Sequence, residues 1–176
     1  MLTEDGKHLY VSHEEYHGLI ERLAVTVHRS GWRFDALLCL ARGGLRPGDV
    51  LSRIFDKPLA ILAAHSYREN AGTVQGELHI AQHISHSEPV LAGSVLLVDD
   101  LVDSGKTLQQ VQQHLQTRYP AITSLRTAVV WAKGCSVFQP DYVAEQLPSN
   151  PWIHQPFEAY DGGGITKLLD KWGNVR

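Results

Sequence analysis

The chain has 176 residues, of which 43% are hydrophobic and 20% are charged, as in ordinary globular domains. This length predicts one domain with a core of its own. The formal net charge of -3 offers no basic field for a nucleic-acid partner. No run approaches the roughly 18 apolar residues of a membrane span, and the first residues lack the pattern of a secretory signal. We therefore expect a cytoplasmic protein that binds neither nucleic acid nor membrane.

The two cysteines, Cys39 and Cys135, are far apart in sequence and have apolar neighbours. Two are too few for a disulfide framework or a cysteine-based zinc site. We expect both to be buried, reduced thiols.

The first predicted element is a helix that begins after Ser12. Ser12 and Glu15 have the spacing of a capping box, and apolar residues then recur at helical spacing as far as His28. Gly31 closes this helix.

Strands and helices alternate along the rest of the chain. Apolar runs predict strands of the sheet interior at residues 34–41, 59–64, 95–98 and 125–132. A shorter run predicts an edge strand at residues 141–145. Helices are predicted after Pro47, between Thr107 and Tyr119, and at residues 165–172. This alternation predicts an α/β fold whose mostly parallel sheet is flanked by helices.

Two glycines follow the strand at residues 34–41. Gly43 and Gly44 permit a ligand to approach the backbone closely, and Arg42 adds a positive charge. The alternative is a tight turn between strand and helix, with Arg42 merely solvated.

The segment at residues 95–107 reads VLLVDDLVDSGKT. Its apolar strand stops at Asp99 and Asp100, at the end where open parallel sheets bind ligands. The following loop precedes a helix, whose N-terminal N–H groups and dipole favour a phosphate. The alternative is that Asp103 or Ser104 only caps the helix. A nucleotide-binding P-loop is excluded because Asp100 stands where that motif needs glycine.

This pattern resembles the phosphoribosyl pyrophosphate (PRPP) signature of the type I phosphoribosyltransferases. Three more pieces resemble the family in the right order: ARGGLRPG at 41–48, WAKG at 131–134 and PWIHQPF at 151–157. The PRPP signature at residues 95–107 is most similar to the hypoxanthine-guanine branch of the family. The piece at residues 151–157 is most similar to the bacterial xanthine-guanine branch. The resemblance spans about residues 34–157.

The resemblance implies a role for each matching residue. Arg42, Gly43 and Gly44 would hold the pyrophosphate, and Asp99 and Asp100 the ribose hydroxyls and Mg²⁺. The 5′-phosphate would lie on Ser104, Gly105, Lys106 and Thr107. Asp103 would be the general base near purine N7, and Lys133 would donate to the 6-oxo group. Trp152 would stack on the purine and Ile153 would contact it through its backbone.

The resemblance also implies how the domain at residues 1–176 is organised. It would have a core at about 12–145, a mobile flap at about 65–89 and a hood at about 146–176. Ser66 and Tyr67 would lie at the base of the flap. A homodimer or homotetramer is expected.

The expected function is purine salvage: PRPP and guanine, xanthine or hypoxanthine would give the nucleoside 5′-monophosphate and pyrophosphate. Two alternatives stay open. One is a non-catalytic sensor of PRPP or nucleotides, although the chain shows no basic nucleic-acid face. The other is a phosphoribosyltransferase for another acceptor, which Lys133 and Trp152 disfavour.

Overall fold

The computed structural model describes residues 1–69, 74–87 and 90–173, with the backbone alone at 65–69 and 74–77. The chain divides into two compact units. Residues 19–150 form the first, here called the core unit. Residues 1–18 and 151–176 form the second, here called the terminal unit.

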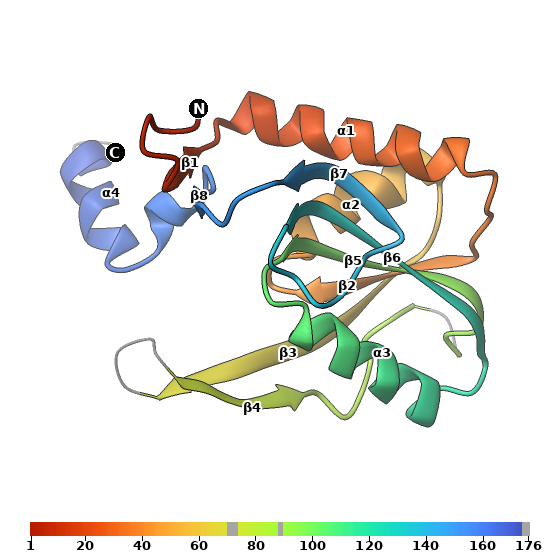
Figure 1. Cartoon of the computed structure of the whole chain (residues 1–176). Coiled ribbons are helices and arrows are strands. Elements are labelled where there is room, and N and C mark those ends of the chain that lie inside the picture. Colours follow the sequence, from red (N-terminus) through yellow and green to blue (C-terminus); the bar gives the residue numbers. More distant parts are fainter. Residues whose placement is uncertain (70–73, 88–89, 174–176) are drawn as a thin grey trace. The chain divides into compact units, whose positions relative to one another are not determined.

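A six-stranded sheet is the centre of the core unit (Figure 1), in the order β4-β3-β2-β5-β6-β7. The strands are β2 (Ala36–Ala41), β3 (Leu59–Glu69), β4 (Val74–Ile80), β5 (Gly93–Val102), β6 (Ile122–Lys133) and β7 (Tyr142–Leu147). Every neighbouring pair is parallel except β3 and β4. The predicted α/β fold with a mostly parallel sheet is therefore confirmed.

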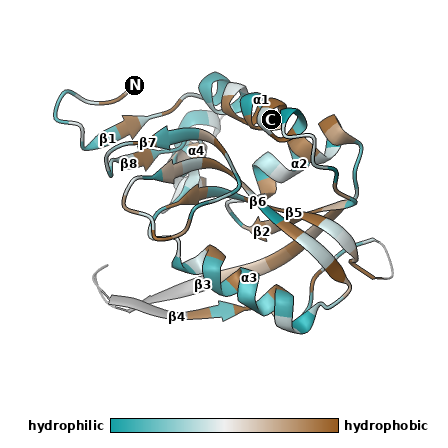
Figure 2. Ribbon diagram, turned by 45° about the vertical axis from the view of Figure 1, so that its right-hand side comes forward, coloured by the Kyte–Doolittle hydropathy of each residue, from teal (hydrophilic) through white to brown (hydrophobic). Residues whose placement is uncertain are grey.

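Helices cover both faces of the sheet, with α2 (Leu45–Phe55) and α3 (Lys106–Arg118) on opposite sides (Figure 1). Figure 2 shows α3 as mostly hydrophilic. Its buried residues Leu108, Val111 and Leu115 belong to the same apolar cluster as Leu38 and Leu97 of the sheet. Burial on both faces explains why β2 and β5 are continuous apolar runs rather than alternating ones.

The first helix, α1 (His13–Arg29), begins at the predicted capping box. The Glu15 N–H donates to the Ser12 hydroxyl at 3.1 Å, and the Ser12 N–H donates to the Glu15 carboxylate at 2.7 Å. The capping box is confirmed. It satisfies one N–H group at the helix start and one just before it.

The prediction that the signature strand ends at residue 98 was wrong. β5 continues to Val102, with Asp99 opposite Val129 and Val102 opposite Ala132. The reason lies in the partner strand, because β6 extends to Lys133 and offers backbone partners beyond the apolar run. Asp99 and Asp100 therefore belong to the strand itself.

The polar stretch after residue 64, where the flap is expected, contains two strands. β3 runs on to Glu69, and β4 returns antiparallel to it. A backbone ladder needs no apolar pattern, so hydropathy missed this hairpin. The flap prediction for 65–89 includes residues 70–73, 88 and 89, which lie outside the described residues, as do the Ser66 and Tyr67 side chains.

The terminal unit contains a small parallel pair, β1 (His8–Tyr10) and β8 (Trp152–His154), then the 3-10 helix η1 (Glu158–Tyr160) and α4 (Gly164–Trp172). The sequence predicted α4 but neither strand, since three residues are too short for a periodicity signal. None of the helices in the described part of the chain is long and apolar enough to cross a membrane.

Candidate active site

The strand order places a topological switch point between β2 and β5. From β2 the chain crosses through α2 to β3 on one side, and from β5 it crosses through α3 to β6 on the other. Open α/β sheets bind ligands in the crevice at the carboxyl ends of two such strands. Here the loops that leave this edge are residues 42–44 and 103–105.

The glycine loop after β2 packs directly on the two acids of β5. A Cβ added to Gly43 would lie 2.6 Å from Cγ of Asp100 and 2.9 Å from Oδ1 of Asp99. A Cβ on Gly44 would lie 2.9 Å from both the N and the O of Leu40. No larger residue fits at either position without displacement, and both carboxylates reach the same loop.

Asp99 and Asp100 are half-buried neighbours. The Asp100 N–H donates to Oδ1 of Asp99 at 2.9 Å. Burial, followed by the Asp100 charge, raises the pKa of Asp99 well above its usual value. The pair therefore favours a nearby cation, which would relieve both effects.

The chemistry of these two acids fits Mg²⁺ bound together with a substrate. Among the described residues, no group of three or more His, Cys, Asp and Glu side chains could hold a metal ion. Mg²⁺ commonly takes one or two carboxylates and completes its shell with water and substrate phosphates. His79, His83 and His86 lie close together in sequence, and each is exposed or half-buried.

The loop at residues 103–105 ends at the start of α3. Gly105 is the N-cap residue, with φ 83°, and it makes no side-chain cap bond. The Lys106 N–H donates to Oγ of Ser104 at 3.5 Å. Neither Asp103 nor Ser104 is therefore the N-cap residue, although the Ser104 side chain contacts the first N–H group of the helix. The first N–H groups of α3 have no partner within the helix, so they can receive a phosphate, beside the exposed Lys106 and the half-buried Thr107.

The last residue of β6 and the turn after it, residues 133–138, contact three consecutive residues of this loop. Nζ of Lys133 lies 3.3 Å from Oδ2 of Asp103. The Val137 N–H donates to the backbone carbonyl oxygen of Ser104 at 3.1 Å. A Cβ on Gly105 would lie 2.6 Å from Oγ of Ser136. Sequence reasoning found only Lys133 in this segment, because the contacts of Ser136 and Val137 depend on the fold.

The two cysteines differ in their exposure to solvent. Cys39 is buried on β2, as predicted, and burial raises the pKa of its thiol to about 12. Cys135 is exposed, so the prediction that it is buried was wrong. It lies in the turn after β6, where its Sγ is 3.8 Å from Oδ1 of Asp103.

The structure brings Arg42, Gly43 and Gly44 to the same sheet edge as Asp99 and Asp100. Lys133 joins Asp103 there. Trp152 and Ile153 lie on β8 of the terminal unit, with Trp152 55% exposed and Ile153 buried. The structure describes these two within their own unit, and their roles stay predictions.

The family model for the phosphoribosyl transferase domain matches residues 10–161. The chain belongs to this family. The family and the switch-point site agree, and the resemblance recognised in the sequence is confirmed.

Solved structures share the fold. One is a purine phosphoribosyltransferase from Pyrococcus horikoshii, 26% identical over 86% of this chain and 94% of that one, with a TM-score of 0.70. Another is the Helicobacter pylori xanthine-guanine-hypoxanthine phosphoribosyltransferase, 25% identical over 93% and 99%, with a TM-score of 0.72. A hypothetical protein from Neisseria gonorrhoeae with bound ppGpp is 20% identical over 94% and 97%, with a TM-score of 0.70, a likeness of fold alone.

Proposed function

We propose that the protein is a 6-oxopurine phosphoribosyltransferase of purine salvage. PRPP and guanine, xanthine or hypoxanthine would give the nucleoside 5′-monophosphate and pyrophosphate. The named purine enzymes among the similar structures support this substrate class.

The observation that carries the proposal is the pairing of Lys133 with Asp103 at 3.3 Å. On a 6-oxopurine, O6 and N7 lie on the same edge of the base. An ammonium and a carboxylate held side by side suit these two atoms: Lys133 donates to O6, and Asp103 faces N7. Adenine presents an amino group in place of O6, which cannot accept from Lys133.

PRPP would lie along the edge of the sheet between the two loops. The N–H groups at the start of α3, with Ser104, Gly105, Lys106 and Thr107, would hold the 5′-phosphate. Arg42 and the glycines after β2 would hold the pyrophosphate, whose approach to the backbone needs residues without a side chain. Asp99 and Asp100 would hold the ribose hydroxyls between them.

Mg²⁺ is the proposed cofactor, held at Asp99 and Asp100 together with the substrate. It would neutralise charge on the leaving pyrophosphate. The raised pKa of Asp99 supports this assignment, because a cation bound beside a buried carboxylate stabilises its charged form.

In the reaction, the bond from ribose C1′ to the pyrophosphate oxygen breaks and a bond from C1′ to purine N9 forms. Pyrophosphate leaves with the bonding electrons. The proton of the purine leaves from N7 to the Asp103 carboxylate, which acts as general base. Trp152 would stack on the purine, and exposure of its ring leaves a surface for this contact.

We also propose a homodimer or homotetramer. Exposed apolar side chains of the terminal unit support self-association, among them Ile165, Leu169 and Trp172. Sedimentation velocity at several protein concentrations tests this.

The experiment is a pyrophosphate-release assay with PRPP and Mg²⁺ against guanine, xanthine, hypoxanthine, adenine, uracil and orotate. Release with at least one 6-oxopurine and not with adenine supports the proposal. Release only with uracil or orotate would show another acceptor. Tight PRPP binding without release from any base would show a sensor.

A further inference from the structure

The strand that carries Trp152 and Ile153 is paired with the N-terminal strand. In the parallel register, His8 is opposite Trp152, Leu9 opposite Ile153 and Tyr10 opposite His154. The Trp152 N–H donates to the Lys7 oxygen at 2.7 Å, and the Val11 N–H donates to the His154 oxygen at 3.1 Å. With three residues in each strand, this ladder has few bonds, so side chains must contribute to its stability.

Two histidines supply that contribution. Nδ1 of His8 lies 2.9 Å from Nε2 of His154, and the rings stack with their centroids 5.1 Å apart. The Tyr10 ring stacks on the His154 ring, with the ring centroids 4.3 Å apart and an angle of 6° between the ring planes. A contact between two ring nitrogens at this distance requires one proton between them, because two neutral acceptors or two N–H groups would repel.

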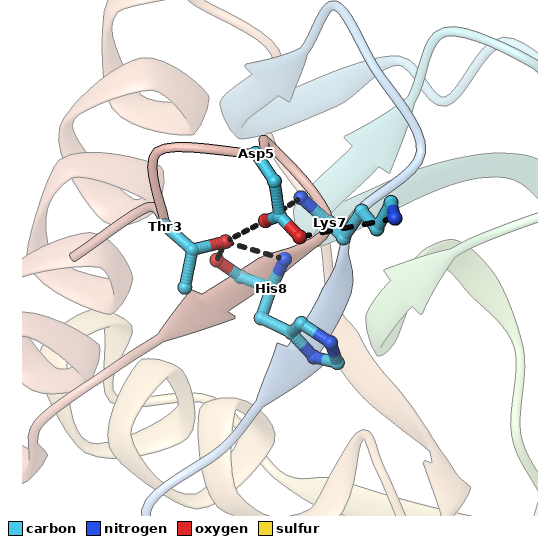
Figure 3. A network of polar contacts seen from close by, with 4 residues as sticks. All are labelled: Thr3, Asp5, Lys7 and His8. Atoms are coloured by element: carbon cyan, nitrogen blue, oxygen red, sulfur yellow. Dashed lines mark hydrogen bonds and ion pairs between the residues drawn. The ribbon is translucent and has the colours of Figure 1, made fainter.

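The backbone before His8 is fixed by its own network (Figure 3). The Thr3 hydroxyl donates to Asp5 at 2.6 Å, and the same oxygen accepts the His8 N–H at 3.1 Å. Asp5 also accepts the Lys7 N–H at 3.1 Å. The His8 ring points away from this network (Figure 3), so it is free to face His154.

We propose that His8 and His154 are positioning residues of the purine subsite. The proton that they share would hold β1 on β8 and thereby fix the backbone that presents Trp152 and Ile153. This inference rests on the proposed function. It assigns a role to the N-terminal strand and to two histidines that have none in the transfer reaction itself.

Charged groups lie around the histidine pair. On the far side of His154, Oε2 of Glu158 lies 3.9 Å from Nδ1. Glu14 and Glu15 of α1 line the same open depression as His154 and Tyr10.

In the segment before β1, Nζ of Lys7 lies 3.9 Å from the Asp5 carboxylate, and the N-terminal ammonium donates to the backbone oxygen of Tyr10. A second proton would place two N–H groups face to face and separate the rings.

The test compares wild type with His8→Ala, His8→Asn and His13→Asn. Asparagine places an amide at the level of the imidazole Nδ1 and does not titrate, whereas alanine removes the contact. His13 is an exposed histidine of the same unit and serves as the matched control. We expect His8→Ala to raise the purine KM about five- to tenfold, the loss expected for one hydrogen bond, with little change in the KM for PRPP. His13→Asn should change neither.

A pH series gives the second readout. Histidines change charge between about pH 5 and pH 8. The purine KM of wild type divided by that of His8→Asn should therefore rise as the pH falls across this range. A ratio independent of pH, or an equal rise of both KM values in His8→Ala, would overturn the inference.

Hydrogen exchange separates this inference from the proposed function. The Trp152 and Val11 amides should exchange faster in His8→Ala than in wild type or His13→Asn. If wild type transfers to no purine but these amides respond, the proposed function fails while the contact between the strands stands. If wild type is active and the amides do not respond, the positioning role fails.

Discussion

Lys133 and Asp103 hold opposite charges 3.3 Å apart, although the Lys133 side chain is 7% exposed and the Asp103 side chain 58%. If the partner of a buried ammonium moves away, the charge is left uncompensated and the protein is destabilised, unless another acceptor takes the partner's place. The 6-oxo group of a bound purine can be that acceptor. In the proposed complex it would accept from Lys133 while Asp103 faces N7 of the same purine. The pair therefore links recognition of the base to the acid proposed to take its proton.

Replacing the acid tests its proposed role as base. Asp103→Asn keeps the shape of the side chain but cannot take a proton, so kcat should fall about 10²- to 10⁴-fold. Binding of PRPP should hardly change, as measured by calorimetry. Asp56→Asn is the control: Asp56 is exposed, and its φ of 51° lies in a region that asparagine tolerates. An equal loss of turnover and PRPP affinity would remove Asp103 from this role.

Removing the proposed stacking ring of Trp152 should weaken binding of the purine but not of PRPP. Base–aromatic stacking contributes about 1–3 kcal/mol, so Trp152→Ala should raise the purine KM about 5- to 150-fold and leave the KM for PRPP near its wild-type value. Tyr160→Ala is the matched control, since Trp152 and Tyr160 are aromatic residues of the same unit that are 55% and 57% exposed. If both constants moved together in Trp152→Ala, the stacking assignment would be wrong.

Two glycines should respond to alanine in opposite ways. Gly44→Ala would force a methyl group against the backbone of Leu40, lowering the free energy of unfolding by about 1–3 kcal/mol. Gly18 lies inside α1 with nothing within 4 Å of an added Cβ. Gly18→Ala should raise that free energy by about 0.5–1 kcal/mol. Urea denaturation measures both, and a stable Gly44→Ala would contradict the close packing of the loop.

The sequence predicted best those features that depend on a run of neighbouring residues or on a short motif. Continuous apolar runs predicted β2 and β5, and the Ser12–Glu15 spacing predicted the start of α1. The order of the signature pieces predicted the family. These features depend on neighbours along the chain, so they are readable without the fold.

Features that depend on partners distant in sequence could not be predicted. β5 passes Asp99 because β6 pairs with it, and β1 exists because β8 lies beside it. The exposure of Cys135 depends on where the turn after β6 lies. For the same reason, the contacts of Ser136 and Val137 with the loop at 103–105 left no sign in the sequence.

The acid pair should make stability depend on pH. The pKa of Asp99 is raised in the folded protein above the unfolded value of about 3.9. As the pH rises from there toward the folded pKa, the unfolded chain loses this proton first, so the group's contribution to folding stability is lost.

Asp99→Asn removes that titration. The free energy of unfolding of Asp99→Asn minus that of wild type, measured without Mg²⁺ or PRPP, should therefore increase as the pH rises from about 4 toward neutral. It should then level off. Asp56→Asn again serves as the control. A difference that does not change with pH would contradict the raised pKa of Asp99 in the folded protein.

The most direct measurement of the central claim is the ratio of kcat/KM for hypoxanthine to that for adenine, in wild type and in Lys133→Gln. Glutamine can donate to a carbonyl or accept from an amino group, so it should relax the choice. We expect a large ratio in wild type and a fall of about 10²-fold or more in the variant, while Lys57→Gln, an exposed lysine outside the site, stays at the wild-type ratio. An unchanged ratio in Lys133→Gln would contradict the recognition of the 6-oxo group by Lys133.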